Sequence, residues 1–114
     1  MIASYWPIRC SNNADFAQPF TFESTPGTPT DVTSWVSSMQ VYDEIGGTLL
    51  LDVAASGSLV NGGVAGTITP TVLEAIMSTL APGLYTYDYR ALSSGLLVRW
   101  LHGPFILEAG VTVP

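Results

Sequence analysis

The sequence contains no lysine and few charges of any kind. Three arginines, Arg9, Arg90 and Arg99, stand against nine carboxylates, so the net charge is −6 over 114 residues. Charged residues make up 11% of the chain, against the ~25% that is usual for soluble globular domains. Three cations are too few for the basic patch that binds nucleic-acid phosphates or acidic lipid headgroups. We therefore expect neither a nucleic-acid partner nor a membrane partner.

We also expect neither a signal peptide nor a membrane span in this sequence. The N-terminus lacks the basic start and apolar run of a signal peptide, and no apolar stretch approaches the ~18 residues of a membrane span. The length fits one domain, 1–114, which can bury a core without a disulfide or a metal. Residues 1–9 include Trp6-Pro7 in a strand-like run, so they form either a first strand or an arm that reaches onto a neighbour.

Cysteine and histidine each occur once, as Cys10 and His102. A single cysteine excludes an intrachain disulfide, and one residue of each type cannot form the Cys/His cluster of a zinc site. Neither residue lies in a recognisable catalytic motif, although the sequence leaves a Cys–His nucleophilic pair open. We expect His102 to be structural or to face solvent.

The carboxylates and amides offer no stronger sign of chemistry. Asp43 and Glu44 are adjacent, but they stand just before the Gly46-Gly47 turn signal and are expected at the solvated end of a hairpin. The oxygens of the 12–15 segment, from Asn12, Asn13 and Asp15, match no calcium-binding loop. The sequence thus predicts a protein that is not an enzyme and that binds no metal and no cofactor.

Most of the chain alternates between apolar and polar residues with the period of a half-buried strand. This pattern predicts strands at residues 15–23, 35–41, 48–54, 59–60, 66–69, 84–92, 96–103 and 105–112. Pro19 indicates an edge strand or a bulge, residues 24–30 an exposed loop, and Ser93-Ser94-Gly95 a hairpin turn. Seven to eight short strands predict an all-β, immunoglobulin-like antiparallel β-sandwich, with a small barrel as the alternative.

One segment has the period of a helix instead. Apolar residues recur at i, i+3, i+4 and i+7, namely Leu73, Ile76, Met77 and Leu80. Thr71 and Glu74 match a capping box, and Pro82-Gly83 ends the segment. We predict one short helix at residues 71–80 that covers one end of a sheet.

The segment after this helix carries a row of aromatic side chains. Tyr85, Tyr87 and Tyr89 share one strand face, while Thr86, Asp88 and Arg90 share the other. Tyrosines bury a large area and keep a polar tip, so this row, together with Trp6, is a candidate interface. The alternative is that the three rings complete the sandwich core.

Arg99 lies within the otherwise apolar residues 96–101. A buried cation there needs a partner, and Asp88 across the predicted hairpin is the best candidate. We expect a buried Asp88–Arg99 ion pair whose loss costs ~3–5 kcal/mol.

Several short motifs follow one another along nearly the whole chain. They are Asn13-Ala-Asp-Phe16 leading into Phe20-Thr-Phe22, Asp31-Val-Thr-Ser-Trp35, Gly66-Thr-Ile-Thr69, Leu80-Ala-Pro-Gly-Leu-Tyr-Thr-Tyr-Asp88, Val98-Arg-Trp-Leu-His-Gly103 and Gly110-Val-Thr-Val113. In this order they resemble small virion proteins of tailed bacteriophages, and in particular the sandwich module that opens some baseplate adaptor proteins. The chain departs from that pattern at Asn12-Asn13, where glycine is more typical, and at Ser34-Trp35, which affects local turns.

The resemblance implies a virion component without catalysis, assembled in the bacterial host cytoplasm beside other virion proteins. A symmetric homo-oligomer in the particle is expected, since the sequence is 47% hydrophobic and poor in charge, although a sticky monomer has the same composition. The first expectation is a tail or baseplate adaptor that links the tail to fibres or to a receptor-binding protein. A capsid decoration protein on the major capsid protein is the alternative. A carbohydrate-binding module, with two aromatic rings exposed side by side, is a third reading from a different class.

Overall fold

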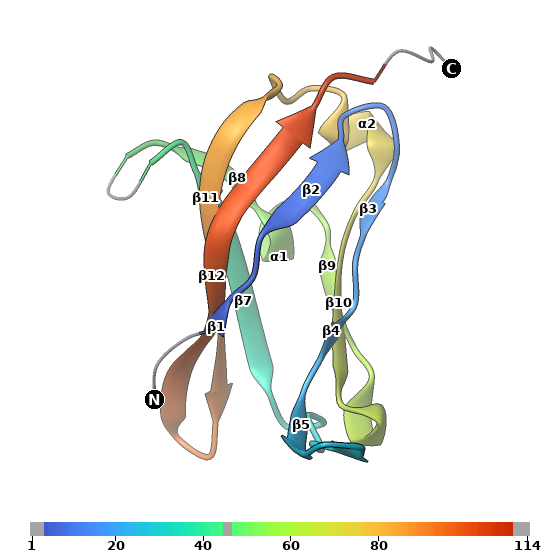
Figure 1. The fold of residues 1–114 in the computed structure, drawn as a ribbon, viewed down its shortest axis with the longest axis vertical. Coiled ribbons are helices and arrows are strands. Elements are labelled where there is room, and N and C mark those ends of the chain that lie inside the picture. Colours follow the sequence, from blue (N-terminus) through green and yellow to red (C-terminus); the bar gives the residue numbers. More distant parts are fainter. Residues whose placement is uncertain (1–3, 45–46, 111–114) are drawn as a thin grey trace.

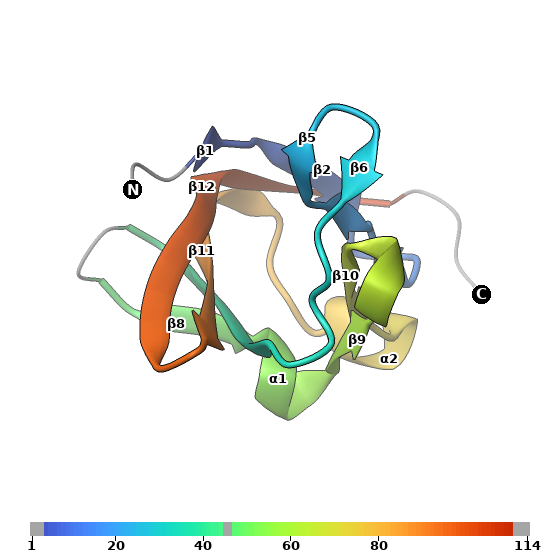
Figure 2. The same ribbon diagram turned by 90° about the horizontal axis from the view of Figure 1, so that it is seen from below.

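The computed structural model describes residues 4–44 and 47–110, which form two β-sheets packed face to face (Figures 1 and 2). The main sheet has the order β1/β2–β12–β11–β7–β8, and the second sheet has β10 between β9 and β3/β4. The strands of the main sheet are β1 (Ser4–Tyr5), β2 (Ile8–Ser11), β7 (Val36–Tyr42), β8 (Leu49–Asp52), β11 (Gly83–Ser93) and β12 (Leu96–Glu108). The strands of the second sheet are β3 (Phe16–Ala17), β4 (Phe20–Thr21), β9 (Ser58–Asn61) and β10 (Thr67–Val72).

This arrangement is an all-β, immunoglobulin-like sandwich, which confirms the predicted fold class. The pairings are antiparallel except where β1 and β2 run parallel to β12. The chain passes from the second sheet to the main sheet before β7 and again before β11, as in the Greek-key connections of that fold. The described residues form twelve strands instead of the predicted seven to eight, because several predicted strands are interrupted and the predicted loop at 24–30 contains a small exposed hairpin of β5 (Glu23–Thr25) and β6 (Thr28–Pro29).

The predictions for Pro19, as an edge strand or a bulge, and for the hairpin turn at 93–95 are confirmed. The edge strand of the second sheet breaks between β3 and β4 at Gln18 and Pro19, where proline removes a ladder donor. Ser94 and Gly95, with φ of 52° and 79°, connect β11 to β12, and positive φ at both positions is what a two-residue type I′ hairpin requires. Gly46 and residues 111–112 of the predicted turn and last strand lie outside the described residues.

The predicted short helix within residues 71–80 is present, but it is shorter than predicted and its predicted cap is wrong. Thr71 belongs to β10, and only one helical turn follows, α2 (Glu74–Met77). Thr71 does not cap it. Instead, the Oδ1 atom of Asp15, 59 residues earlier, accepts a hydrogen bond from the Glu74 backbone N–H at 2.7 Å. A second one-turn helix, α1 (Val53–Ser56), and a 3₁₀ turn at Gly63–Ala65 were not predicted, and Asp52 caps α1 where the sequence predicted continuous strand.

The core contains aromatic side chains that link the two sheets. Phe20 of β4 lies 5.6 Å from Tyr89 of β11 between ring centroids, and Phe16 lies 5.6 Å from Phe105 of β12. Trp35, just before β7, stacks on Trp100 of β12 at 5.0 Å and 16°. The other fully buried apolar residues that pack on these rings include Ile8, Val32, Met39, Val41, Val53, Ile68, Val72, Met77 and Leu107.

The N-terminal segment is an interrupted edge strand of the main sheet over its described part, and not a free arm. β1 and β2 both pair with β12, but the pairing stops between them, at Trp6 and Pro7, opposite Gly103 and Pro104. A Cβ atom on Gly103 would lie 2.9 Å from the Trp6 carbonyl oxygen, and Gly103 has a φ of +155°. Because both prolines fall in this gap, β12 runs unbroken from residue 96 to 108, and the predicted separate strand at 105–112 is wrong.

We predict that Gly103→Ala destabilises the fold by at least about 3 kcal/mol, because the new methyl group meets backbone atoms that cannot move without breaking the β1–β12 pairing. Gly27→Ala is the matched control. Gly27 also has a positive φ, of +85°, but a Cβ atom on it would meet no other atom within 4 Å, so its cost is about 1–2 kcal/mol. Urea unfolding of both variants measures the difference, and equal losses would contradict the close approach.

Candidate interaction surface

The tyrosine row of β11 faces the core. Tyr87 and Tyr89 are buried, so they are not an interface, and the prediction that they form one is wrong. The Tyr87 hydroxyl donates to the Trp6 carbonyl oxygen at 2.5 Å, and the hydroxyls of Tyr89 and Ser37 share a hydrogen bond of 2.6 Å. Burial raises the pKa of both phenols, that of Tyr89 to about 12. These rings therefore serve the fold, as the alternative reading of the row predicted.

Tyr85 and Trp6, the other two members of the predicted interface, are more exposed than Tyr87 and Tyr89. Tyr85 is half-buried, and its hydroxyl donates to the Ala81 carbonyl oxygen at 2.6 Å, four residues upstream. This contact matches the tyrosine corner of immunoglobulin-like domains, which ties the start of the strand to the preceding connection. Trp6 is 53% exposed and remains available to a partner.

The opposite side of the main sheet, here called the outer face, carries the charges. It comprises alternate residues of three neighbouring strands, namely Val36, Ser38, Gln40 and Tyr42 of β7, Leu84, Thr86, Asp88, Arg90 and Leu92 of β11, and Leu97, Arg99, His102, Pro104 and Ile106 of β12. A bulge next to Tyr89 shifts the register of β12, so that Arg99 stands opposite Arg90 on this face while Trp100 points into the core.

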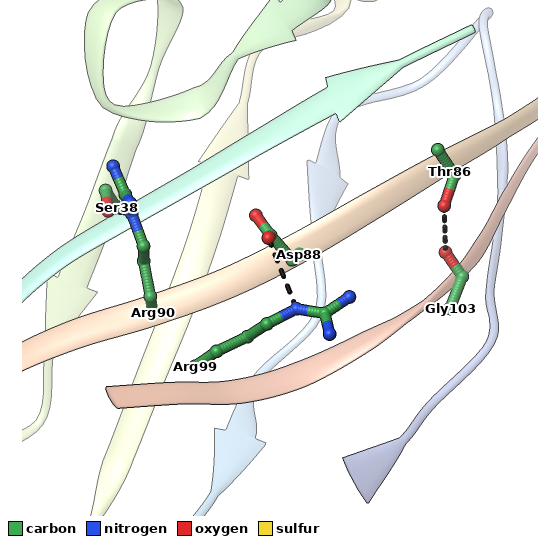
Figure 3. Close-up of polar contacts among 6 residues, drawn as sticks. All are labelled: Ser38, Thr86, Asp88, Arg90, Arg99 and Gly103. Carbon is green, nitrogen blue, oxygen red and sulfur yellow. Dashed lines mark hydrogen bonds and ion pairs between the residues drawn. The ribbon is translucent and has the colours of Figure 1, made fainter. Parts of the chain in front are cut away.

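The predicted Asp88–Arg99 pair exists, but it is not buried. Arg99 Nε lies 3.3 Å from Asp88 Oδ2, and the two side chains are 52% and 43% exposed (Figure 3). The register bulge moves Arg99 from the apolar interior to the outer face, which the alternation of residues 96–101 does not reveal. An exposed pair contributes about 0–1 kcal/mol, so the expected cost of ~3–5 kcal/mol is also wrong.

Three apolar side chains lie side by side at the hairpin end of the outer face. Leu92 pairs with Val36 on one side and with Leu97 on the other, and we call these three residues the apolar row. Val36 is 65% exposed, Leu97 54% and Leu92 41%. The row points away from the second sheet, because Tyr89 and Ala91 on the other side of β11 are buried, so the second sheet does not cover it. Leu96, next to the turn, adds another exposed leucine.

The predicted interface included only the tyrosines of this strand, but the position of Leu92 could have predicted the apolar row. Leu92 has the same parity as Thr86, Asp88 and Arg90, which alternation places on the face opposite the tyrosines. A leucine on that polar face is exposed unless another layer covers it.

The remaining candidate groups do not form a reaction centre within the described residues. Cys10 pairs with Leu107 and His102 with Tyr5, so they stand five residues, or about 16 Å, apart along β12. Burial, and to a lesser extent Glu108, raises the pKa of the Cys10 thiol to about 11. The Cys–His pair that the sequence left open is therefore not assembled.

Asn12 and Asp15 make structural hydrogen bonds to backbone groups that are distant in sequence. Asn12 donates to the Leu80 carbonyl oxygen at 3.3 Å and accepts from the Gly110 N–H at 3.0 Å, while Asp15 caps α2. Asp43 and Glu44 are exposed next to the β7–β8 connection, as expected for a hairpin end. No group of three or more histidine, cysteine or acidic side chains in the described ranges is arranged to hold a metal ion.

Comparisons with known proteins do not indicate a function, so the functional assignment rests on the residues of this chain. Models of known protein families give no match to this chain, and curated protein sequences give none either. None of the helices in the described part of the chain is long and apolar enough to cross a membrane.

We predict that Arg99→Met changes the free energy of unfolding by less than about 1 kcal/mol, because the ion pair it removes is exposed to solvent. Thermal or urea unfolding of this variant and of Asp88→Asn provides the measurement. A loss of 3 kcal/mol or more in either variant would mean that the pair is buried after all.

We also predict that stability falls as the pH rises from 10 to 12. Tyr87 and Tyr89 keep their protons in the folded state at a pH where the unfolded phenols, with a pKa near 10, have lost them. Unfolding then releases protons, which lowers the free energy of unfolding by about 1.4 kcal/mol per pH unit for each phenol. Tyr89→Phe should reduce this slope in alkaline urea titrations, whereas Tyr5→Phe, which changes an exposed ring, should not. Equal slopes in the wild type and Tyr89→Phe would contradict the burial of Tyr89.

Proposed function

We propose that this chain is a non-enzymatic structural subunit of a tailed-bacteriophage virion, in which it serves as a tail or baseplate adaptor that links the tail to fibres or to a receptor-binding protein. The order of short motifs along nearly the whole chain, which resembles the sandwich module of such adaptors, supports the class of protein. The immunoglobulin-like sandwich of the described residues agrees with that class.

The observation that carries the proposal is the apolar row. Val36, Leu92 and Leu97 form a contiguous apolar strip on a sheet face, next to the turn of the β11–β12 hairpin. Exposed apolar side chains that lie together favour a protein partner, because burying them removes apolar surface from water at about 25 cal/mol per Å². A subunit held among neighbours in a particle provides such a partner.

The shortage of charge supports the same role. Soluble monomers are usually covered with lysine and glutamate, whereas this chain has no lysine and only three arginines. Charged residues are depleted at the centres of protein interfaces, where each charge would have to be desolvated or paired. A glycan-binding role is less well supported, because Tyr87 and Tyr89 are buried and cannot stack on sugar rings.

The test is cryo-electron microscopy of purified particles of the phage that encodes this chain. The adaptor role predicts density for the sandwich at the tail end or in the baseplate. Density on the outer capsid lattice would contradict the adaptor role and favour a decoration protein. Absence of the chain from the particles would contradict both.

A matched pair of variants links the proposal to the apolar row. Leu92→Glu with Leu97→Glu should prevent incorporation of the protein into particles, because the row can then no longer be buried at a contact. Ser24→Glu changes an exposed residue of the separate β5–β6 sheet, which does not carry the row, and should be incorporated normally. Equal incorporation of both proteins would mean that the row is not the contact.

A further inference from the structure

We infer that the outer face is the surface on which two copies of this chain pack against each other, with their β11 strands antiparallel. The inference goes beyond the proposed function, since it concerns the isolated protein. It is carried by the order of side chains along β11, by the separation of opposite charges on the outer face, and by the two hollows that hold the negative charges.

The outer residues of β11 have an apolar side chain at each end and polar side chains between them, whichever direction the strand runs. They run Leu84, Thr86, Asp88, Arg90 and Leu92, with a leucine at each end and the charges between. Leu84 is 70% exposed and Leu92 is 41% exposed. When two such strands face each other antiparallel about an axis at Asp88, Leu84 of each copy lies over Leu92 of the second copy. The two Asp88 side chains then meet on the axis, each of them paired with Arg99 of its own copy. A two-fold axis thus pairs apolar with apolar at both ends of the contact.

Positive charge remains unbalanced in the half of the face next to the apolar row. Arg90 and Arg99 stand directly opposite each other, which is unfavourable for like charges in neighbouring strands. Asp88 neutralises Arg99, whereas Arg90 donates from Nε to the neutral Ser38 hydroxyl at 3.2 Å (Figure 3). Within residues 4–44 and 47–110, no carboxylate forms an ion pair with Arg90.

Negative charge gathers in the other half of the face. Thr86 lines two adjoining hollows. The first includes Glu44 and the Asp88–Arg99 ion pair, and the second includes Asp43 together with Leu84, Tyr5 and His102. Because Asp88 neutralises Arg99, the carboxylates of Glu44 and Asp43 are the negative charges in excess. The antiparallel arrangement places Arg90 of one copy over Thr86 of the second copy, and therefore beside these carboxylates. The contact occurs twice, once on each side of the axis, so one face supplies both halves of the charge complementarity.

A second copy explains this face better than a nucleic acid does. A phosphate backbone would be attracted by Arg90 but repelled by Glu44 and Asp43 on the same face, and the whole chain carries a net charge of −6. The same arrangement of charges that repels a polyanion fits a copy of the chain turned through 180°.

The test is sedimentation velocity over a range of protein concentrations, with two charge-reversal variants. The wild type should form dimers. Arg90→Glu and Glu44→Arg should each weaken dimerisation about tenfold or more, because each places like charges together at both contacts. An equimolar mixture of the two variants should restore the dimer, because every contact in the mixed pair again joins opposite charges. Glu23→Arg, which makes the same charge change on β5, should leave dimerisation as in the wild type.

Several results would overturn the inference. A wild type that stays monomeric at every concentration contradicts the dimer, and species larger than the dimer contradict the two-fold arrangement. Failure of the mixed variants to associate, with melting curves showing that both are folded, contradicts the pairing of Arg90 with Glu44. None of these results bears on whether the chain is found in virions, and absence from virions leaves the dimer intact.

Discussion

Contacts between aromatic rings of the two sheets are the interaction on which the rest of this structure depends. Antibody domains join the corresponding strands with a disulfide, but this chain has a single cysteine. Phe20 of β4 and Tyr89 of β11 meet at this place, and Phe22 contacts both Tyr89 and Trp35. Such pairs add about 0.5–1.5 kcal/mol each to the gain from burying the rings. The core is thus closed by side chains that must face inward.

The inward orientation of these rings determines which side chains lie on the outer face. Because side chains alternate along a strand, placing Tyr87 and Tyr89 in the core sends Asp88, Arg90 and Leu92 to the other side. The Tyr87 hydroxyl also holds the N-terminal strand by its bond to the Trp6 carbonyl oxygen, beside Gly103. One set of rings therefore ties the two sheets together, anchors the edge strand and leaves a face of the main sheet available for contacts.

Much of the fold follows from residue patterns that act over short distances. Alternation along β7 and β11, the proline break before β4 and the Ser94-Gly95 turn all depend on neighbours in sequence, and the structure confirms them. The contact of Asp88 with Arg99 also follows from the hairpin, because the turn sets the two strands side by side.

The predictions that are wrong concern places where distant segments decide the local structure. Asp15 caps α2 across 59 residues, so the helix begins at Glu74 and not at Thr71 as its own sequence indicates. The bulge beside Tyr89 changes which face Arg99 occupies, and no alternation pattern in residues 96–101 reports a bulge. Likewise, Gly103-Pro104 reads as the end of a strand until Trp6 and Pro7 are seen to lie opposite it.

The most direct measurement of the central claim is nitration of the native protein with tetranitromethane, with each tyrosine followed by mass spectrometry at low protein concentration. Closure of the core by inward-facing tyrosines predicts that Tyr5 reacts in the folded protein, while Tyr87 and Tyr89 react only after unfolding in urea. Nitration of Tyr87 and Tyr89 as fast as that of Tyr5 in the folded protein would contradict this account.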